Sequence, residues 1–175
     1  MIFERIDKLE GLGTYMVKKN DEYIVTIEDM GSEGEGVGKI DGYTVFVKDA
    51  LPGEKARIKI TKAGKSFGYG RLMEVITPSE YRVEPKCPIA RKCGGCQIQE
   101  MSYEAQLAFK EKKVQNNLER IGKIAPSEYE MCTIIGMEEP YNYRNKAQYP
   151  VGLDKDGRII MGFYAGRTHS IIPCE

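Results

Sequence analysis

The sequence KIDGYTVFVKDALPGEKARIKITKA occupies residues 39–63 and decides the fold of the first part of the chain. Its Asp-Gly pair at 41–42 and Pro-Gly pair at 52–53 are turn signals, and the residues around them favour strands. Ile58 and Ile60 alternate with basic residues, as expected of a strand with one buried face and one solvated face. This stretch therefore predicts short strands with a basic outer surface.

Two further β-prone runs flank this stretch, EYIVTIEDM at 22–30 and YGRLMEVI at 69–76. About five short strands in so few residues predict a small closed or nearly closed barrel, for which the oligonucleotide-binding type is one common solution. We expect a polar lead-in over residues 1–19 and the barrel over residues 20–77. The glycines at 31, 34, 36 and 38 are expected to form a turn between strands, because no helix pattern follows them as a nucleotide-binding loop requires.

Beyond the barrel, the prolines of TPSEYRVEPK predict a linker over residues 78–86 and a second domain over residues 87–175. A helix is predicted from about Ser102 to Ile121, with Ser102 as its N-cap and Gly122 as its stop. Apolar residues recur along it at helical spacing, namely Leu107, Val114, Leu118 and Ile121. The runs MCTIIGM, KAQYPVGL, RIIMGFYA and HSIIP predict strands, with Asp156-Gly157 as a hairpin turn. The fold class is therefore all-β plus α+β.

The composition is that of an ordinary water-soluble chain, with 175 residues, 41% apolar and 30% charged, and zero net charge. No stretch approaches the roughly 20 apolar residues of a membrane span, and we expect a cytoplasmic protein without a membrane partner. The charge is unevenly spread, because residues 1–35 hold four bases and nine acids whereas residues 39–71 hold eight bases and three acids. That asymmetry points weakly to a face that binds a polyanion.

Cysteines supply the most specific pattern, Cys87-Pro-Ile-Ala-Arg-Lys-Cys93-Gly-Gly-Cys96. Thiolates that converge from a tight loop are what an iron–sulfur cluster needs, and glycines let the backbone approach closely. The fourth ligand must come from Cys132 or Cys174. We favour Cys174, which follows a proline at a strand end, over Cys132, which lies in an apolar run that looks buried. Zinc is the competing metal, although four-cysteine zinc sites usually consist of two close pairs.

The same stretch closely resembles the cluster loop and following helix of the RNA (uracil-5-)-methyltransferases that modify ribosomal RNA. The positions that carry the resemblance are Cys87, Cys93, Gly94, Gly95, Cys96, Gln99, Tyr103, Gln106, Leu107 and Lys110. It continues through YNYRNKAQYPVG and GFYAGRTHSIIPC, where family members place the fourth cluster cysteine at the position of Cys174. GSEGEGVGKIDGYTVFVKDALPGEKARIKI resembles the TRAM domain, the small RNA-binding barrel of these enzymes.

This resemblance implies a 4Fe-4S cluster on Cys87, Cys93, Cys96 and Cys174, with a structural rather than a redox role. It also implies that the whole protein transfers a methyl group from S-adenosylmethionine to C5 of a uracil, in 23S rRNA or alternatively in tRNA. The family's methyltransferase domain, with its catalytic cysteine and general base, would lie beyond residue 175, so this chain should be a monomeric recognition fragment that is inactive alone.

The expected RNA contacts are basic residues of both parts, namely Lys59, Lys62, Lys65, Arg71, Arg144 and Lys146. His169, the only histidine, is expected to be a surface or packing residue. Two other function classes stay open. The chain could be a stand-alone RNA-binding module with a cluster or zinc, or a sensor in which a labile cluster controls RNA binding.

Overall fold

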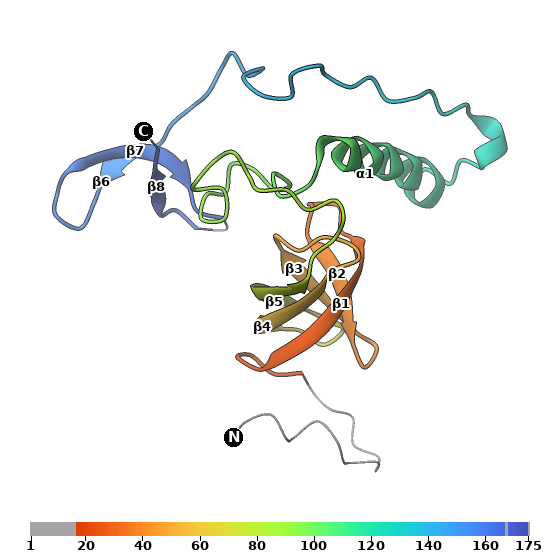
Figure 1. Ribbon diagram of the computed structural model, residues 1–175, viewed down its shortest axis with the longest axis horizontal. Coiled ribbons are helices and arrows are strands. Elements are labelled where there is room, and N and C mark those ends of the chain that lie inside the picture. Colours follow the sequence, from red (N-terminus) through yellow and green to blue (C-terminus); the bar gives the residue numbers. More distant parts are fainter. Residues whose placement is uncertain (1–16, 167, 175) are drawn as a thin grey trace, which may run out of the picture.

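The computed structural model describes residues 17–166 and 168–174, so most of the predicted lead-in lies outside the described residues. The first part of the chain is a closed barrel with the strand order β1-β2-β3-β5-β4 (Figure 1). Its strands are β1 (Glu22–Met30), β2 (Gly36–Ile40), β3 (Tyr43–Lys48), β4 (Lys55–Ala63) and β5 (Phe67–Thr77). The predicted five-stranded barrel is confirmed, and the glycine-rich stretch forms the β1–β2 turn and the first part of β2.

Side chains alternate between the inside and the outside along the strands, and those inside the barrel are mostly branched and apolar. Val45, Val47, Ile58 and Ile60 are completely buried, while the residues between them face outward. The barrel closes through β3 and β5, which pair in parallel, whereas all the other neighbouring strands pair antiparallel. The expected one-sided strand around Ile58 is thus confirmed, and its basic residues lie on the outer surface.

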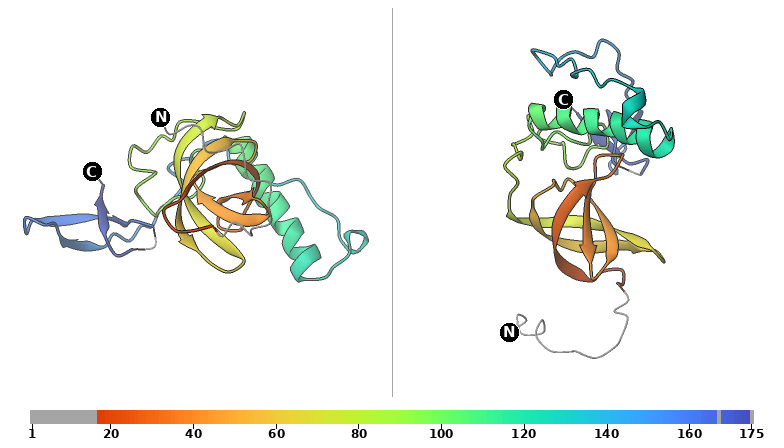
Figure 2. Two further views of the ribbon diagram at one scale, coloured as in Figure 1. Left: turned by 90° about the horizontal axis from the view of Figure 1, so that it is seen from below. Right: turned by 90° about the vertical axis from the view of Figure 1, so that its right-hand side faces the viewer.

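Residues 78–102 have no regular secondary structure and lie against one end of the barrel (Figure 2). Residues 87–96, which we call the cysteine loop, lie within this segment. Arg82 and Met101 form an isolated β-bridge, so the segment returns close to its starting point. The backbone N–H of Val83 also donates to the carbonyl of Glu100 at 2.9 Å. These contacts close the cysteine loop at its base.

The predicted helix begins where expected, because the Ser102 hydroxyl accepts a hydrogen bond from the Ala105 N–H at 3.4 Å. It is regular over α1 (Tyr103–Asn116) and continues as a π-helical turn, η1 (Asn117–Ile121). Its apolar stripe, however, does not pack into a core. No residue of α1 or η1 is buried, and the exposed fractions of Val114 and Ile121 are 52% and 77%.

After a 3-10 turn, η2 (Pro126–Glu128), an irregular segment runs back over α1 towards a small sheet beside the barrel (Figure 1). The predicted strand MCTIIGM is wrong, because residues 131–137 have no strand in this structure and Cys132 is exposed rather than buried. The sheet has the order β6-β7-β8, with β6 (Val151–Leu153), β7 (Ile159–Tyr164) and β8 (Ile171–Pro173). The predicted hairpin turn is confirmed, with Gly157 at a φ of 77°. No described helix is long and apolar enough to cross a membrane.

Candidate nucleic-acid interface

A cavity of about 990 Å³ lies between the outer face of β3 and β5 and the cysteine loop, and we call it the groove. The barrel contributes Phe46, Lys48, Tyr69 and Arg71 to one wall. The other wall is lined by the cysteine loop with Arg91, Lys92, Gly94 and Cys96, and by Ala165 and Gly166, which follow β7. The β1–β2 turn closes one side with Glu33 and Glu35. The groove therefore brings together parts of the chain that are far apart in the sequence.

Strand pairing places three basic residues side by side on the outer surface of the barrel. Arg71 of β5 pairs with Lys59 of β4 on one side and with Lys48 of β3 on the other. We call Lys59, Arg71 and Lys48 the basic row. Lys59 lies 3.8 Å from the Glu22 carboxylate, but Arg71 forms no ion pair with any described residue. An uncompensated guanidinium in a groove is suited to bind phosphate, because it offers several N–H donors in one plane.

Next to the basic row lie three aromatic rings. Phe46 of β3 and Tyr69 of β5 are register partners, and their ring centroids are 5.8 Å apart. Phe67 packs edge-on against both rings, at 5.7 Å from Phe46 and 5.9 Å from Tyr69. All three rings are on the outside of the barrel, because the residues between them are the ones that face the core. We call these three residues the aromatic cluster.

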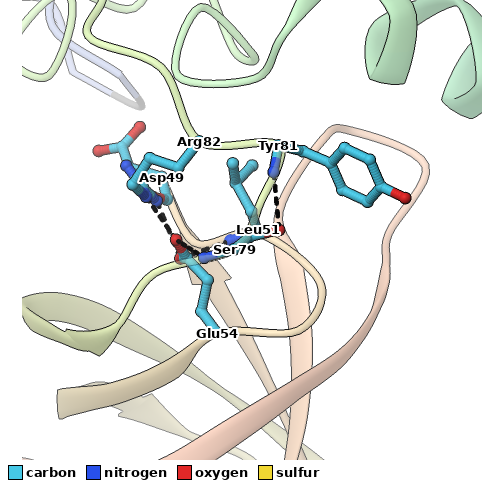
Figure 3. Close-up of polar contacts among 6 residues, drawn as sticks. All are labelled: Asp49, Leu51, Glu54, Ser79, Tyr81 and Arg82. Atoms are coloured by element: carbon cyan, nitrogen blue, oxygen red, sulfur yellow. Dashed lines mark hydrogen bonds and ion pairs between the residues drawn. The ribbon is translucent and has the colours of Figure 1, made fainter.

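A buried carboxylate joins the barrel to the segment that follows it. Glu54 is completely buried and accepts hydrogen bonds from the backbone N–H of Leu51 at 2.9 Å and of Ser79 at 3.3 Å. The guanidinium of Arg82 binds both oxygens of Glu54 and donates to the Asp49 carbonyl at 2.7 Å (Figure 3). Because Glu54 belongs to the barrel and Arg82 to the following segment, this ion pair fixes where the chain leaves the barrel.

Smaller contacts place the cysteine loop over the β1–β2 turn and β3. Lys48 Nζ donates to the Cys93 carbonyl at 3.5 Å. Gly34 has a φ of +88°, and a Cβ there would lie 2.8 Å from Ile98, so a side chain at this position would push the segment away. On the far side of the turn, Lys113 of α1 donates to the Ser32 carbonyl at 2.6 Å. The β1–β2 turn is therefore held between the segment that carries the cysteine loop and α1.

Acidic groups make the groove less positive than its bases alone suggest. Asp49 lies 4.0 Å from Lys48, and its side chain is mostly buried. Burial raises the pKa of the Asp49 carboxyl above its ordinary value, although the positive charges of Lys48, Arg91 and Arg82 act in the opposite direction. Asp49 therefore offsets part of the positive charge that Lys48 and Arg91 bring to the groove.

The cysteine loop is paired with the end of β7. Cys93 forms an isolated β-bridge with Ala165, and the Gly94 N–H donates to the Tyr164 carbonyl at 2.9 Å. A Cβ on Gly94 would lie 2.7 Å from that carbonyl oxygen, so the glycine is required for this close approach. Cys93 is buried, and its Sγ accepts a hydrogen bond from the Gly95 N–H at 3.3 Å.

Cys174 follows β8, where its N–H donates to the Met161 carbonyl at 3.3 Å. Met161 and Ala165 are four positions apart, which corresponds to about 13 Å of extended chain. Cys174 is thus on the same small sheet as the contact with Cys93, but not beside it. No three His, Cys, Asp or Glu side chains converge as a metal site within residues 17–166 and 168–174. The four thiols suit iron or zinc by their chemistry, yet this arrangement does not place them as one ligand set.

The structure brings only two of the six predicted RNA-contact residues together, Lys59 and Arg71, which are neighbours in the basic row. Lys62 and Lys65 lie at the far end of β4 and in the β4–β5 turn, and neither lines the groove. Arg144 and Lys146 lie in the irregular segment before β6, where both are exposed.

Sequence reasoning missed five groove residues, namely Phe46, Lys48, Tyr69, Arg91 and Lys92. The alternation of Thr44, Phe46 and Lys48 with buried valines was a usable signal that these side chains face outward. It could not show that β3 lies beside β5, because that pairing joins strands that are not consecutive. His169 is exposed and packs edge-on against Tyr164, as expected of a surface residue.

Comparison with known proteins identifies the barrel. Residues 17–73 match the family described as TRAM domain. A Clostridium acetobutylicum protein described as an uncharacterized RNA methyltransferase is 53% identical over 159 residues, which are 91% of this chain and 34% of that protein. Proteins with the same description from Halalkalibacterium halodurans and Listeria innocua are 52% and 48% identical, over 91% and 90% of this chain. The chain spans about a third of the length of these curated relatives, 34% in each case.

Two solved structures show weaker similarity. A conserved protein of Methanococcus maripaludis is 34% identical with a TM-score of 0.33, and the match covers 38% of this chain and all of that protein. The tRNA (uracil-54, C5)-methyltransferase of Pyrococcus abyssi, in complex with S-adenosyl-L-homocysteine, is 24% identical with a TM-score of 0.38. That match covers 64% of this chain and 22% of the enzyme. Both TM-scores are low, and neither similarity bears on the function.

Proposed function

We propose that this chain is the RNA-recognising part of an S-adenosylmethionine-dependent RNA (uracil-5-)-methyltransferase that acts on 23S rRNA. The observation that carries the proposal is the basic row beside the groove, on a barrel that matches the TRAM domain. The relatives described as RNA methyltransferases support the enzymatic half of the proposal. S-adenosylmethionine would be bound within the part of the relatives' length that this chain does not match, and no residue of this chain is assigned a catalytic role.

Recognition would begin with phosphate binding in the groove. Arg71 on the barrel wall and Arg91 and Lys92 on the cysteine-loop wall face the same space. A strand of RNA lying between them would be held from both sides, and each phosphate contact would release bound counterions. Contacts of this kind position an RNA without reading its sequence, so the choice of uracil would be made elsewhere in the protein.

The second element of the proposal is a 4Fe-4S cluster held by Cys87, Cys93, Cys96 and Cys174. Three of these thiols belong to one short loop, and all four are free. The loop is already paired with the chain at the end of β7, and β7 pairs with β8, which leads to Cys174. When bound, the cluster would cross-link these segments, and methyl transfer to a uracil would require no electrons from it. Cys174 would have to move closer to the loop than it lies here.

Titration of RNA binding against salt tests the recognition role. The full chain, the double variant R71Q/K92Q and the double variant K62Q/K65Q would be compared by fluorescence anisotropy on a single-stranded RNA. The groove variant should bind more weakly and lower the slope of log affinity against log salt by about 0.7 for each lost phosphate contact. The variant at Lys62 and Lys65 removes the same charge and tests the other predicted contacts.

If only the K62Q/K65Q variant lowers the slope, the RNA lies on the β4–β5 turn and not in the groove. If no RNA binds in a salt-dependent way, the recognition role itself is wrong. The enzymatic half is tested with tritiated S-adenosylmethionine and a protein of the relatives' full length. Label at C5 of uracil in 23S rRNA is expected, whereas label in tRNA alone would reassign the substrate.

A further inference from the structure

The aromatic cluster continues the basic row along the same two strands. In the β3–β5 pair, Phe46 is opposite Tyr69, and the next outward pair is Lys48 opposite Arg71. Two residues along a strand correspond to about 7 Å, so the rings and the cations are neighbours on one surface. Phe46, Tyr69 and both cations line the groove. The two kinds of side chain therefore face the same groove.

The rings are not required to fill the barrel. The core between the strands is closed by aliphatic side chains, including Val45, Val47 and Ile58, none of which has measurable exposure. Phe67, in contrast, is 46% exposed and lies on the outside together with its two ring partners. Cross-strand aromatic pairs do stabilise sheets, so a purely structural role is the competing explanation. A structural role would not depend on what occupies the groove.

We infer that the groove binds an unpaired segment of RNA, with at least one base stacked on the aromatic cluster while its phosphates contact the basic row. This inference rests on the proposed RNA-binding function and names the class of RNA that the same site takes. Aromatic rings beside a positively charged track are the arrangement by which proteins bind single strands, because every base presents a π-face.

An RNA duplex does not fit this description. Its bases are stacked on each other, and its outer surface presents phosphates and 2′-hydroxyls rather than base faces. Arg71 and Lys92 could contact a duplex, but Phe46 and Tyr69 would find no base to stack on. The groove is also walled on its second side by Gly94 of the cysteine loop and by Gln97, so that Phe46 and Tyr69 face an opposite wall rather than an open surface.

The test compares three RNA probes of about 12 nucleotides, a length within the usual range of single-strand sites. One is an unstructured strand with 2-aminopurine at its centre, the second is the same strand with abasic residues in its central part, and the third is a hairpin duplex of equal charge. The full 175-residue chain should prefer the base-bearing strand. Its binding should change 2-aminopurine fluorescence, because stacking on a ring alters the emission of this base.

The variant Phe46→Leu keeps an apolar side chain but removes the ring. It should weaken binding of the base-bearing strand by about fivefold or more, the lower end of what one stacked base contributes. Binding of the abasic strand should not change. Phe46→Trp should restore affinity and the fluorescence change, which a variant that merely damaged the barrel would not do. Tyr81→Leu is the matched control, because Tyr81 is 46% exposed and lies outside the groove lining.

Equal affinity for the base-bearing and abasic strands, with no effect of Phe46→Leu, would overturn the stacking inference and leave salt-dependent RNA binding intact. A preference for the hairpin would also overturn it. If the unaltered chain bound none of the three probes, the proposed RNA-binding function itself would be contradicted. Failure of the stacking inference and failure of the proposed function therefore give different results.

Discussion

Glu100 is a carboxylate that the fold holds in an unfavourable place, with 4% of its surface exposed, at the base of the cysteine-loop segment. Burial raises the pKa of its side chain, and the nearby Asp49 carboxylate raises it further. The positive charges of Arg82 and Lys48 lower it in part. The folded chain therefore binds a proton at Glu100 more tightly than the unfolded chain does.

This shift predicts a pH-dependent effect of Glu100→Gln. The stability that Glu100 contributes is fully present below the ordinary pKa of a glutamate and is lost as the pH rises through its raised, folded-state pKa. The variant should therefore match the unaltered chain in acid and have the larger free energy of unfolding at neutral pH. Urea unfolding from acid to neutral pH measures the difference in the free energy of unfolding. Glu104→Gln is the control, because it removes an exposed carboxylate. If Glu100→Gln were equally stable or less stable than the unaltered chain at neutral pH, the prediction would be wrong.

At the scale of elements, the Glu54–Arg82 pair joins the barrel to the segment that carries the cysteines. The Glu54 side chain is completely buried and that of Arg82 is 21% exposed, so water can do little to replace a lost partner. Arg57 offers a matched exposed pair of contacts, with Glu22 at 3.1 Å and Glu74 at 3.1 Å. Burial, rather than the number of contacts, should decide which arginine matters more.

Replacing Arg82 by methionine should lower the free energy of unfolding by about 3–5 kcal/mol, because it leaves the charge of Glu54 buried without its partner. Arg57→Met should lower the free energy of unfolding much less, as for exposed ion pairs. Urea denaturation followed by circular dichroism gives both values. Equal losses from the two substitutions would show that the buried pair has no special role in holding the segment on the barrel.

The helix shows how far local signals extend. Ser102 as N-cap and the end of the helical turns at Gly122 follow from short-range hydrogen bonding and were predictable. Whether the apolar residues of the helix are buried was not predictable. Their burial depends on a partner surface, and the helical spacing of apolar residues gives no information about that surface. Here α1 is attached through Lys112 and Lys113, which contact Asp29 and Ser32 beside the β1–β2 turn, and its apolar residues remain exposed or half-buried.

On the scale of the whole molecule, the cysteine loop, β7 and β8 form a chain of contacts that a cluster could complete. Cys93 contacts the end of β7, and β8 pairs with β7 and leads to Cys174. Cys132 has no comparable position, because it is exposed in the irregular segment. Cys174 and Cys132 can therefore be compared directly, because only Cys174 is connected to the cysteine loop through β7 and β8.

Protein purified without oxygen should contain about four irons and four acid-labile sulfides per chain if the 4Fe-4S proposal is right. Cys174→Ser should abolish both, whereas Cys132→Ser should leave them unchanged. Closure of the long loop between Cys96 and Cys174 should also stabilise the second part, by roughly 4 kcal/mol if it behaves as a covalent cross-link. One zinc per chain and no sulfide would rule out the cluster, and loss of metal in the Cys132 variant would reassign the fourth ligand.

The sequence alone determined the five strands of the barrel, the start of α1 and the β6–β7 hairpin, because alternation, caps and turn residues act between near neighbours. It also supplied the cysteine spacing and two members of the basic row, Lys59 and Arg71. It failed at residues 131–137, where an apolar run suggested a strand and the structure has none.

Only the tertiary structure decided which side chains share a surface. Parallel pairing of β3 with β5 aligns Phe46 with Tyr69 and Lys48 with Arg71, although more than twenty residues separate the partners in the sequence. The contact of Lys48 with the Cys93 carbonyl likewise places the cysteine loop beside that surface, and the groove lies between them. Such pairings follow from barrel closure and from the fit between distant segments, and a local pattern of residues carries no information about them.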